Sequence, residues 1–411
     1  VSGEFAPAST FKVVSTSAAV QAGYSTSSSY PCTSTFSFGN TSKRNYESRP
    51  YGNISLARAL EVSCNTVFYK LGYDTWLREG GLKAKPGGRE VFVSTARGFG
   101  YGAKTGVDLP AERPGRIVSR ADRLATWQEM KDIWCSRAKT GYPEEPNRAK
   151  AAYLTAIAKE NCADGWQYRG GDAVNFVIGQ GDTLVTPLQV ARTYAAIANG
   201  GTLWTPQVAK AVVRPDGTVV EEFTPRAAGR LTASAATIRY LQQALRGVAT
   251  DGTARGVFAD FPVAVSAKTG SGQVTGKQDT SWFASYAPSN NPQYAVVMMI
   301  SQGGTGSGTS APGVRAIYEA LFGVKGSTVD PKASVLPGGR LPTVLPTITE
   351  DGRVLQPGAT APPRASAAPS ATASPTPTGT PAAPASAAGP PLALLPAERR
   401  GAGRGIAGVG T

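Results

Sequence analysis

The sequence predicts a mixed α/β domain with an antiparallel central sheet flanked by helices, and three observations lead to this fold class. Helical and strand-like patterns alternate over the first 325 residues, the strand-like runs gather late in that stretch, and turns rich in glycine, serine, asparagine or proline separate them. The chain of 411 residues is 41% hydrophobic, which suffices for a packed core. Alternation of this kind is typical of domains in which helices cover a sheet.

The spacing of apolar residues predicts the individual elements. Helices are expected over residues 10–22, 56–71, 187–199 and 314–322. The third of these ends at Gly200-Gly201 and the fourth follows Pro312-Gly313, as helix ends and starts commonly do. Strands are expected over residues 263–267, 281–287 and 293–300. Because short turns separate these strands, we expect them to form an antiparallel meander.

The composition changes after residue 325. We expect a folded domain over residues 1–325, a linker over 326–356 and a tail over 357–411. The tail consists mostly of alanine, proline, serine and threonine, so it cannot bury a core and should be disordered. Because the chain starts with Val1 directly before a helical pattern, we expect the domain to be truncated at its N-terminus.

The composition also excludes several classes of function. Histidine is absent, which excludes histidine-based triads, imidazole general bases and histidine metal sites. The four cysteines are too scattered for a CxxC pair, so we expect neither a metal nor a cofactor. The formal net charge is +14, but lysine and arginine are dispersed, which favours a solvated basic surface over a nucleic-acid partner. No apolar run approaches the length of about 20 residues that a membrane span needs.

The first candidate motif is Ser9-Thr10-Phe11-Lys12, which places a hydroxyl and an amine one helical turn apart on the same face. Without histidine, a lysine held neutral by burial or by a neighbouring cation could take the proton of a nucleophilic serine. Ser136-Arg137-Ala138-Lys139 has the same spacing, so this motif alone is a weak signal. Taken singly, Ser9 fits equally well as a helix cap.

The second candidate motif is Ser63-Cys64-Asn65, within the expected helix 56–71. Its serine could relay a proton, and its asparagine could orient a substrate amide. Ser289-Asn290-Asn291 has the same S-x-N pattern but lies in an expected turn next to proline, so we interpret it as a chance match.

The third candidate motif, Lys-Thr-Gly, occurs at Lys104, Lys139 and Lys268. For this motif to bind an extended peptide, it needs a strand edge. There the backbone can pair with the peptide while the lysine and hydroxyl groups meet the peptide carboxylate. Of the three copies, Lys268-Thr269-Gly270-Ser271 alone follows a β-rich run and precedes a glycine-rich turn and another strand. We therefore expect Lys268, Thr269, Gly270 and Ser271 to belong to the site.

In this order, S-x-x-K, S-x-N and K-T-G are the signature of penicillin-binding proteins and serine β-lactamases. The chain resembles penicillin-binding proteins over nearly all of residues 5–325, and most of all the class B, elongation-type transpeptidases of high-GC Gram-positive bacteria. Further segments carry the resemblance: Gly98-Phe99-Gly100, residues 105–110, Gly179-Gln180-Gly181, residues 185–189, residues 198–201, Ser281-Trp282-Phe283 and residues 317–322. The resemblance implies a penicillin-binding protein/serine β-lactamase-like fold, with a membrane anchor upstream of Val1.

The resemblance also implies a mechanism, in which Ser9 attacks the carbonyl between the two terminal D-alanines of a peptidoglycan stem peptide. Lys12 is then the base and Ser63 passes a proton to the leaving amine, with Asn65 and Lys268 completing the catalytic set. Thr269, Gly270 and Ser271 bind the substrate, the two hydroxyls holding its terminal carboxylate.

The activity that the resemblance implies is D,D-transpeptidation, with stem peptides as substrates and penicillin and other β-lactam antibiotics as inhibitors. The location that it implies is the extracytoplasmic face of the cell membrane. The partner that it implies is a glycosyltransferase of the elongation machinery. No metal or cofactor takes part.

Three other functions share part of this signature. A serine β-lactamase would need a base for deacylation, but no E-x-x-x-N-like pattern stands out between Asn65 and Lys268, and the insertion over 121–171 makes the chain too large. A D,D-carboxypeptidase uses the same acyl-enzyme with water as acceptor. A β-lactam-binding sensor or scaffold would bind without turnover. The sequence leaves the last two open.

The even number of cysteines is compatible with two disulfides and equally with buried free thiols. Given the extracytoplasmic location that the resemblance implies, we predict that Cys32 pairs with Cys64 and Cys135 with Cys162. Both pairs then need Cα separations below about 7 Å.

Overall fold

The computed structural model describes residues 1–214, 219–274, 276–324, 347–348 and 354–355. The chain forms two compact units. Among the described residues, the larger unit holds 1–208 and 225–324, and the smaller unit holds 209–224 and two short strands. Of the expected linker 326–356, these two strands and no further residues are described, and the expected tail 357–411 lies outside the described residues.

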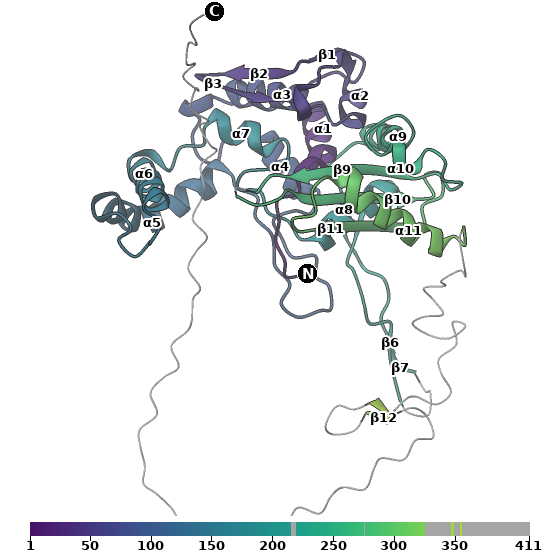
Figure 1. The fold of residues 1–411 in the computed structure, drawn as a ribbon. Coiled ribbons are helices and arrows are strands. Elements are labelled where there is room, and N and C mark those ends of the chain that lie inside the picture. Colours follow the sequence, from purple (N-terminus) through teal and green to yellow (C-terminus); the bar gives the residue numbers. More distant parts are fainter. Residues whose placement is uncertain (215–218, 275, 325–346, 349–353, 356–411) are drawn as a thin grey trace, which may run out of the picture. The chain divides into compact units, whose positions relative to one another are not determined.

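A three-stranded antiparallel sheet forms the centre of the larger unit (Figure 1). Its strands β9 (Ser266–Gly272), β10 (Thr280–Ala287) and β11 (Tyr294–Ile300) lie in the order β11-β10-β9, so β9 is an edge strand of this sheet. The predicted antiparallel meander is confirmed. Strand β9 starts at Ser266 rather than at residue 263 and runs through the Lys-Thr-Gly motif, because pairing with β10 outweighs the low strand propensity of glycine and lysine.

Helices cover both faces of this sheet. Successive β10 side chains point to opposite faces, so Trp282 and Tyr286 pack in one core cluster and Phe283 in another. The first cluster includes buried residues of α8 (Pro187–Ala198), and the second includes those of α11 (Ala311–Leu321). Strand β10 is buried along its whole length as a result.

Three of the four expected helices are confirmed, and the one expected over residues 56–71 is interrupted. The expected helix 10–22 is a 3-10 turn, η1 (Ala8–Phe11), followed by α1 (Lys12–Gln21), and α8 and α11 lie where predicted. The prediction of one helix over 56–71 is wrong, because the stretch forms α2 (Leu56–Glu61) and α3 (Asn65–Arg78). The break is at Ser63, whose φ of 58° is left-handed and cannot continue a right-handed helix.

The remaining elements are short or lie apart from the sheet. The other α-helices among the described residues are α4 (Val91–Gly98), α5 (Arg120–Thr140), α6 (Arg148–Asp164), α7 (Gly170–Phe176), α9 (Ala235–Thr250) and α10 (Arg255–Phe258). Two-stranded pairs in the larger unit are β1 (Ser29–Cys32) with β4 (Gly52–Ser55), β2 (Thr35–Phe38) with β3 (Thr41–Arg44), and β5 (Thr202–Trp204) with β8 (Ala227–Arg230). The smaller unit contains β6 (Ala211–Val213) with β7 (Val219–Glu222), and β12 (Thr347–Ile348) with β13 (Val354–Leu355).

Helices α5 and α6 lie side by side and form most of the predicted insertion (Figure 1). The Trp127 indole N–H of α5 donates to the Asn161 carbonyl of α6 over 2.8 Å, and Cys135 is disulfide-bonded to Cys162. Few residues of this helical hairpin are buried. Among the described residues, no helix has both the length and the apolarity needed to cross a membrane.

Candidate active site

Ser9 lies in the 3-10 turn that leads into α1, and this turn is tightly held from both sides. The Thr10 hydroxyl donates to the Pro7 carbonyl over 2.6 Å, and the Ala8 N–H donates to the Gly179 carbonyl over 2.9 Å. Gly179 has a φ of 69°, and a Cβ there would lie 2.4 Å from the Ala8 carbonyl oxygen, so this close approach requires glycine. Ser9 is partly exposed whereas Thr10, Phe11 and Lys12 are buried. Ser9 is therefore partly accessible, whereas the lysine is not.

The Lys12 amine brings the first two predicted motifs together. Its Nζ lies 2.6 Å from Asn65 Oδ1, 2.7 Å from the Ser63 carbonyl oxygen and 3.1 Å from Ser63 Oγ. It also lies 5.3 Å from the centre of the Phe68 ring. The side chain of Lys12 is fully buried. Burial, and then the positive charge of Lys268, lower its pKa well below the usual range.

These contacts suit a neutral Lys12 as well as a charged one. An ammonium group would donate to all three oxygens. A neutral amine has two N–H donors, which match the Ser63 carbonyl and Asn65 Oδ1, and its lone pair is then available to accept a hydroxyl proton. Because neither form leaves a buried donor unpaired, hydrogen bonding does not oppose the loss of the proton that burial favours.

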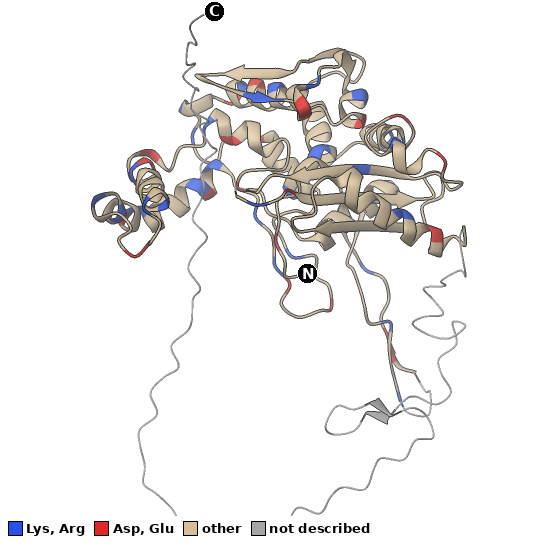
Figure 2. Ribbon diagram, viewed as in Figure 1, with Lys and Arg blue, Asp and Glu red and all other residues tan. Residues whose placement is uncertain are grey.

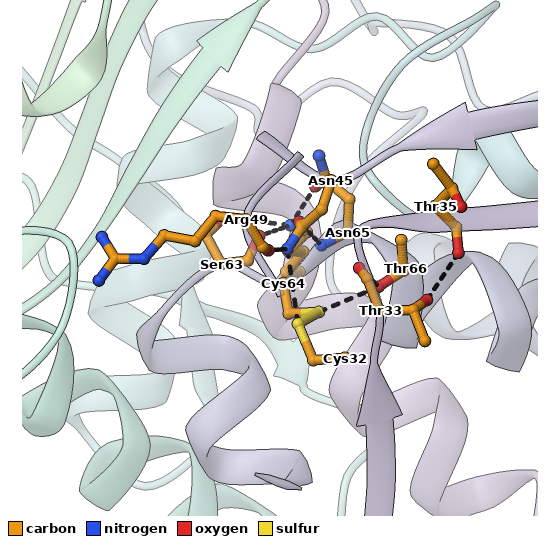
Figure 3. Close-up of a disulfide and its surroundings, with 10 residues drawn as sticks. Cys32, Thr33, Thr35, Asn45, Arg49, Ser63, Cys64, Asn65 and Thr66 are labelled. Carbon is orange, nitrogen blue, oxygen red and sulfur yellow. Dashed lines mark hydrogen bonds between the residues drawn. A yellow bond between two sulfur atoms is a disulfide. The ribbon is translucent and has the colours of Figure 1, made fainter. Parts of the chain in front are cut away.

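The break between α2 and α3 positions Ser63 and Asn65. A left-handed backbone is uncommon for serine, and such residues cluster at functional sites because the surrounding structure must impose them. Two contacts do so here (Figure 3). Cys64 is disulfide-bonded to Cys32 at the end of β1, and the Asn65 N–H donates to Asn45 Oδ1 over 2.9 Å.

Asn45 is a buried side chain that links this break to a neighbouring loop (Figure 3). Its Nδ2 donates to the Arg49 carbonyl over 2.6 Å and lies 3.5 Å from Cys32 Sγ. The sequence did not point to Asn45, because its partners are distant in the chain and a lone asparagine in a loop carries no motif. The nearby disulfide is the signal that could have found it.

Lys268 lies on the edge strand β9, and its side chain is fully buried. Its Nζ donates to the Thr269 carbonyl over 3.0 Å, and burial lowers its pKa to about 7. The prediction that this Lys-Thr-Gly copy lies at a strand edge is confirmed, although β9 runs through the motif rather than ending before it. Gly270 lets β9 approach the turn that bears Ser9, because a Cβ there would lie 3.2 Å from Thr10 Cγ2 and 3.3 Å from the Pro7 carbonyl oxygen.

The two predicted carboxylate-binding hydroxyls already have partners within the domain. The Thr269 and Thr253 hydroxyls are hydrogen-bonded over 2.6 Å, and Ser271 Oγ accepts the Gly306 N–H over 3.2 Å. Thr253 was not predicted from the sequence, whereas the glycine-rich run 303–308 is expected there to be a loop beside the site. Gly306 belongs to the Gly303–Gly308 run, and its place against the backbone of Gly270 leaves no space for a side chain. A ligand carboxylate would have to share or replace these bonds.

The chance copies of the motifs lie elsewhere. Lys104-Thr105-Gly106 is in a loop, where Thr105 and Gly106 donate to the Glu112 carboxylate. Lys139 and Ser136 are on α5 in the helical hairpin. Ser289 lies beyond the end of β10, where its hydroxyl accepts a hydrogen bond from Ser266. The structure therefore brings Lys12 together with Ser63 and Asn65, and packs β9 against the turn that bears Ser9.

The family model described as the penicillin binding protein transpeptidase domain matches residues 1–319. The chain belongs to this family. Among curated relatives of this transpeptidase domain is the peptidoglycan D,D-transpeptidase MrdA of Salmonella typhimurium, 24% identical over 307 residues, which cover 70% of this chain and 41% of that protein. Another is the peptidoglycan D,D-transpeptidase PbpA of Mycolicibacterium smegmatis, 27% identical over 343 residues, which cover 78% of this chain and 56% of that protein. The chain thus spans less than two thirds of these relatives.

Solved structures show the same fold. Penicillin-binding protein A of M. tuberculosis, as a ceftriaxone acyl-enzyme, matches with a TM-score of 0.56 and 23% identity, covering 77% of this chain and 60% of that one. PBP2 of Pseudomonas aeruginosa, in complex with WCK 5153, matches with a TM-score of 0.59 and 24% identity, covering 80% and 64%. The predicted penicillin-binding protein fold is therefore confirmed.

Proposed function

We propose that this transpeptidase domain cross-links peptidoglycan stem peptides through an acyl-enzyme on Ser9, and that penicillin inhibits it by acylating the same residue. One observation carries the proposal. An accessible serine is followed, one turn later, by a fully buried lysine that contacts Ser63 and Asn65. This arrangement supplies a nucleophile, a base and a proton relay without histidine.

In the first half of the reaction, neutral Lys12 takes the Ser9 hydroxyl proton as Ser9 Oγ bonds to the carbonyl carbon between the two terminal D-alanines. The oxyanion forms between the backbone N–H groups of Ser9 and Ser271. When the C–N bond breaks, the proton passes from Lys12 through the Ser63 hydroxyl to the leaving D-alanine amine. The acceptor amine of a second stem peptide then attacks the ester. The new amide C–N bond forms as the ester C–O bond to Ser9 breaks, and the proton that the amine loses passes through Ser63 and Lys12 to Ser9 Oγ.

The edge position of β9 supports peptide binding beside Ser9. An extended stem peptide can pair with the free edge of β9, as peptides do on exposed strands. Lys268, with a pKa of about 7, would contribute a positive charge that is partly present near neutrality. We assign Thr269, Gly270 and Ser271 to substrate binding, with the two hydroxyls exchanging their present partners for the substrate carboxylate.

The family and the disulfides support a proposal for the location and the partner. We place the domain at the extracytoplasmic face of the cell membrane, because disulfides persist in oxidising compartments and the described cysteines form two. A matching structure with 27% identity and a TM-score of 0.59, covering 80% of this chain and 48% of that one, is described as a peptidoglycan synthase complex that coordinates polymerization and crosslinking. We propose a glycosyltransferase of the elongation machinery as partner here as well.

A labelling experiment tests the nucleophile. Fluorescent penicillin should label the wild-type protein covalently, and Ser9→Ala should abolish the label because the ester needs its hydroxyl. Ser136→Ala is the matched control, since Ser136 stands in the same S-x-x-K spacing on the exposed α5 helix and should label normally. Loss of label in the control with retention in Ser9→Ala would disprove the assignment.

A product assay separates the three functions that share this acyl-enzyme. Incubation with a donor stem pentapeptide and an acceptor amine should give cross-linked product together with free D-alanine. Free D-alanine without cross-links would identify a carboxypeptidase. Penicillin labelling without either product would identify a sensor or scaffold.

A further inference from the structure

A basic cleft of the larger unit shares no lining residue with the candidate active site. Its volume is about 510 Å³, and it is formed by the end of α4, the following loop, α8 and the strand pair β5–β8. Five cationic side chains line it: Arg97, Lys104, Arg192, Arg226 and Arg230. Among the described residues that line the cleft there is no aspartate or glutamate. Elsewhere the lysines and arginines are spread over many elements of the unit (Figure 2). The five cations that line one cleft therefore differ from this dispersed distribution.

Neutral acceptors hold two of these arginines in place. Arg192 Nε donates to the Trp204 carbonyl over 2.8 Å. Arg230 donates to Thr202 Oγ1 over 3.1 Å and to the Gly200 carbonyl over 3.0 Å. These bonds fix the guanidinium groups without neutralising their charge.

Glycine keeps the cleft open beside two of the guanidinium groups. A Cβ at Gly100 would lie 3.4 Å from Arg192 Nη1, and a Cβ at Gly106 would lie 4.0 Å from Arg226 Nη2. Both glycines have a positive φ, of 89° and 81°, which other residues rarely adopt. The backbone therefore leaves space next to the charges.

Nearby carboxylates offset part of the positive charge. Asp122 forms an ion pair with Arg97 over 2.5 Å. Glu112 acts electrostatically on Lys104 and Arg192, but its oxygens accept hydrogen bonds from Thr105 and Gly106. Among the described contacts of the cleft residues, these two carboxylates face five cations and leave an excess of positive charge, which an anionic ligand would balance.

We propose that this cleft binds a phosphate-bearing ligand. Four of the five cations are arginines, whose planar fork matches phosphate oxygens in pairs. The volume of the cleft falls within the range of about 300–1,000 Å³ typical of small-molecule sites. This volume exceeds the space that one phosphate needs. The ligand therefore carries phosphate on a larger body, either as a soluble phosphate compound or as a lipid headgroup. This assignment does not depend on the transpeptidase activity.

The test compares two double variants that remove the same charge. Lys104→Gln/Arg226→Gln alters the cleft, and Lys139→Gln/Arg148→Gln alters an exposed lysine and an exposed arginine of the helical hairpin. Inorganic pyrophosphate is titrated at fixed salt while the thermal unfolding midpoint is measured, because a ligand that binds the folded state raises this midpoint. We expect a saturating rise in the wild type and the control, and an affinity at least about tenfold weaker in the cleft variant. Fluorescent penicillin should label all three proteins equally.

Vesicle binding distinguishes the source of the phosphate. Vesicles of phosphatidylglycerol are compared with vesicles of phosphatidylcholine alone. Binding of phosphatidylglycerol that the cleft variant loses and the control keeps assigns the site to a lipid headgroup, and a response to pyrophosphate alone assigns it to a soluble phosphate compound. Equal losses in both double variants, or no response to either probe, overturn the proposal. The single variants Lys104→Gln and Arg226→Gln give the same comparison if the double variant does not fold.

Discussion

The two disulfides of this domain close loops of similar length in very different surroundings. Cys32–Cys64 spans 32 residues and Cys135–Cys162 spans 27, so each restricts the unfolded chain by a similar amount. Cys32 and Cys64 are 1% and 0% exposed, whereas Cys135 and Cys162 are half-buried. The first bond holds the residue between Ser63 and Asn65, and the second joins the two helices of the hairpin. The same covalent link thus supports a site in one region and a local fold in the other.

The packing around each bond explains this difference. Helices α2 and α3 bury residues such as Leu60 and Phe68 in the main core, which fixes the chain on either side of Ser63. In the hairpin, α5 and α6 bury few residues, among them Ile157 and Ala158. We therefore expect that changes near Cys32–Cys64 affect acylation, and that matched changes in the hairpin affect local stability alone.

Removal of each disulfide should show the largest contrast. In Cys32→Ala/Cys64→Ala, the left-handed turn at Ser63 loses its covalent support, so we expect penicillin acylation to slow by at least about tenfold. The free energy of unfolding should also fall by about 2–5 kcal/mol. Cys135→Ala/Cys162→Ala should acylate at the wild-type rate. Stopped-flow acylation and urea denaturation measure both effects, and equal slowing in the two variants would contradict the comparison.

A single hydrogen bond in each region should give a smaller contrast. Asn45→Ala leaves the Asn65 N–H without its acceptor, at a cost of about 1–3 kcal/mol, and lets Asn65 move relative to Lys12. We expect slower acylation with little change in the far-ultraviolet circular dichroism spectrum. Asn147→Ala is the matched control, because the Asn147 side chain accepts the Lys150 N–H at the start of α6. It should destabilise the hairpin by about 1 kcal/mol and leave acylation unchanged, so a similar effect in both variants would argue against a positioning role for Asn45.

The sequence predicted those features of the candidate site and of the disulfides that local patterns encode. The β-rich run before Lys268 predicted a strand next to this Lys-Thr-Gly copy, and β9 runs through the motif, while both predicted disulfide pairings are confirmed. The break at Ser63 was missed because serine carries no helix-stop signal, and tertiary contacts from Asn45 and Cys32 hold its left-handed backbone.

The basic cleft was missed for a related reason. Its cations come from three distant stretches of the sequence, 97–104, Arg192 and 226–230, which the fold brings together, so their dispersal along the chain concealed it. Contacts between distant residues are what local patterns do not encode.

The smallest contrast should be in the pH dependence of the free energy of unfolding, which changes by about 1 kcal/mol for each pH unit. Lys268 has a folded-state pKa of about 7, below the usual lysine value of about 10.4, so between these two pH values the unfolded chain binds a proton that the folded domain does not. The contribution of Lys268 to the free energy of unfolding should therefore rise as the pH increases from about 7 to about 10.

The measurement compares the wild type with Lys268→Met. Other groups titrate in both proteins, so the quantity to measure is the difference between their unfolding free energies, by urea denaturation at each pH. This difference should grow in favour of the wild type across that range, whereas the difference for Lys139→Met, an exposed lysine in the same Lys-Thr-Gly sequence, should stay constant. A constant difference for Lys268→Met would mean that Lys268 keeps its proton in the folded domain. The Lys-Thr-Gly copy on β9 and the copy on the helical hairpin would then not differ in how their lysines affect the pH dependence of stability.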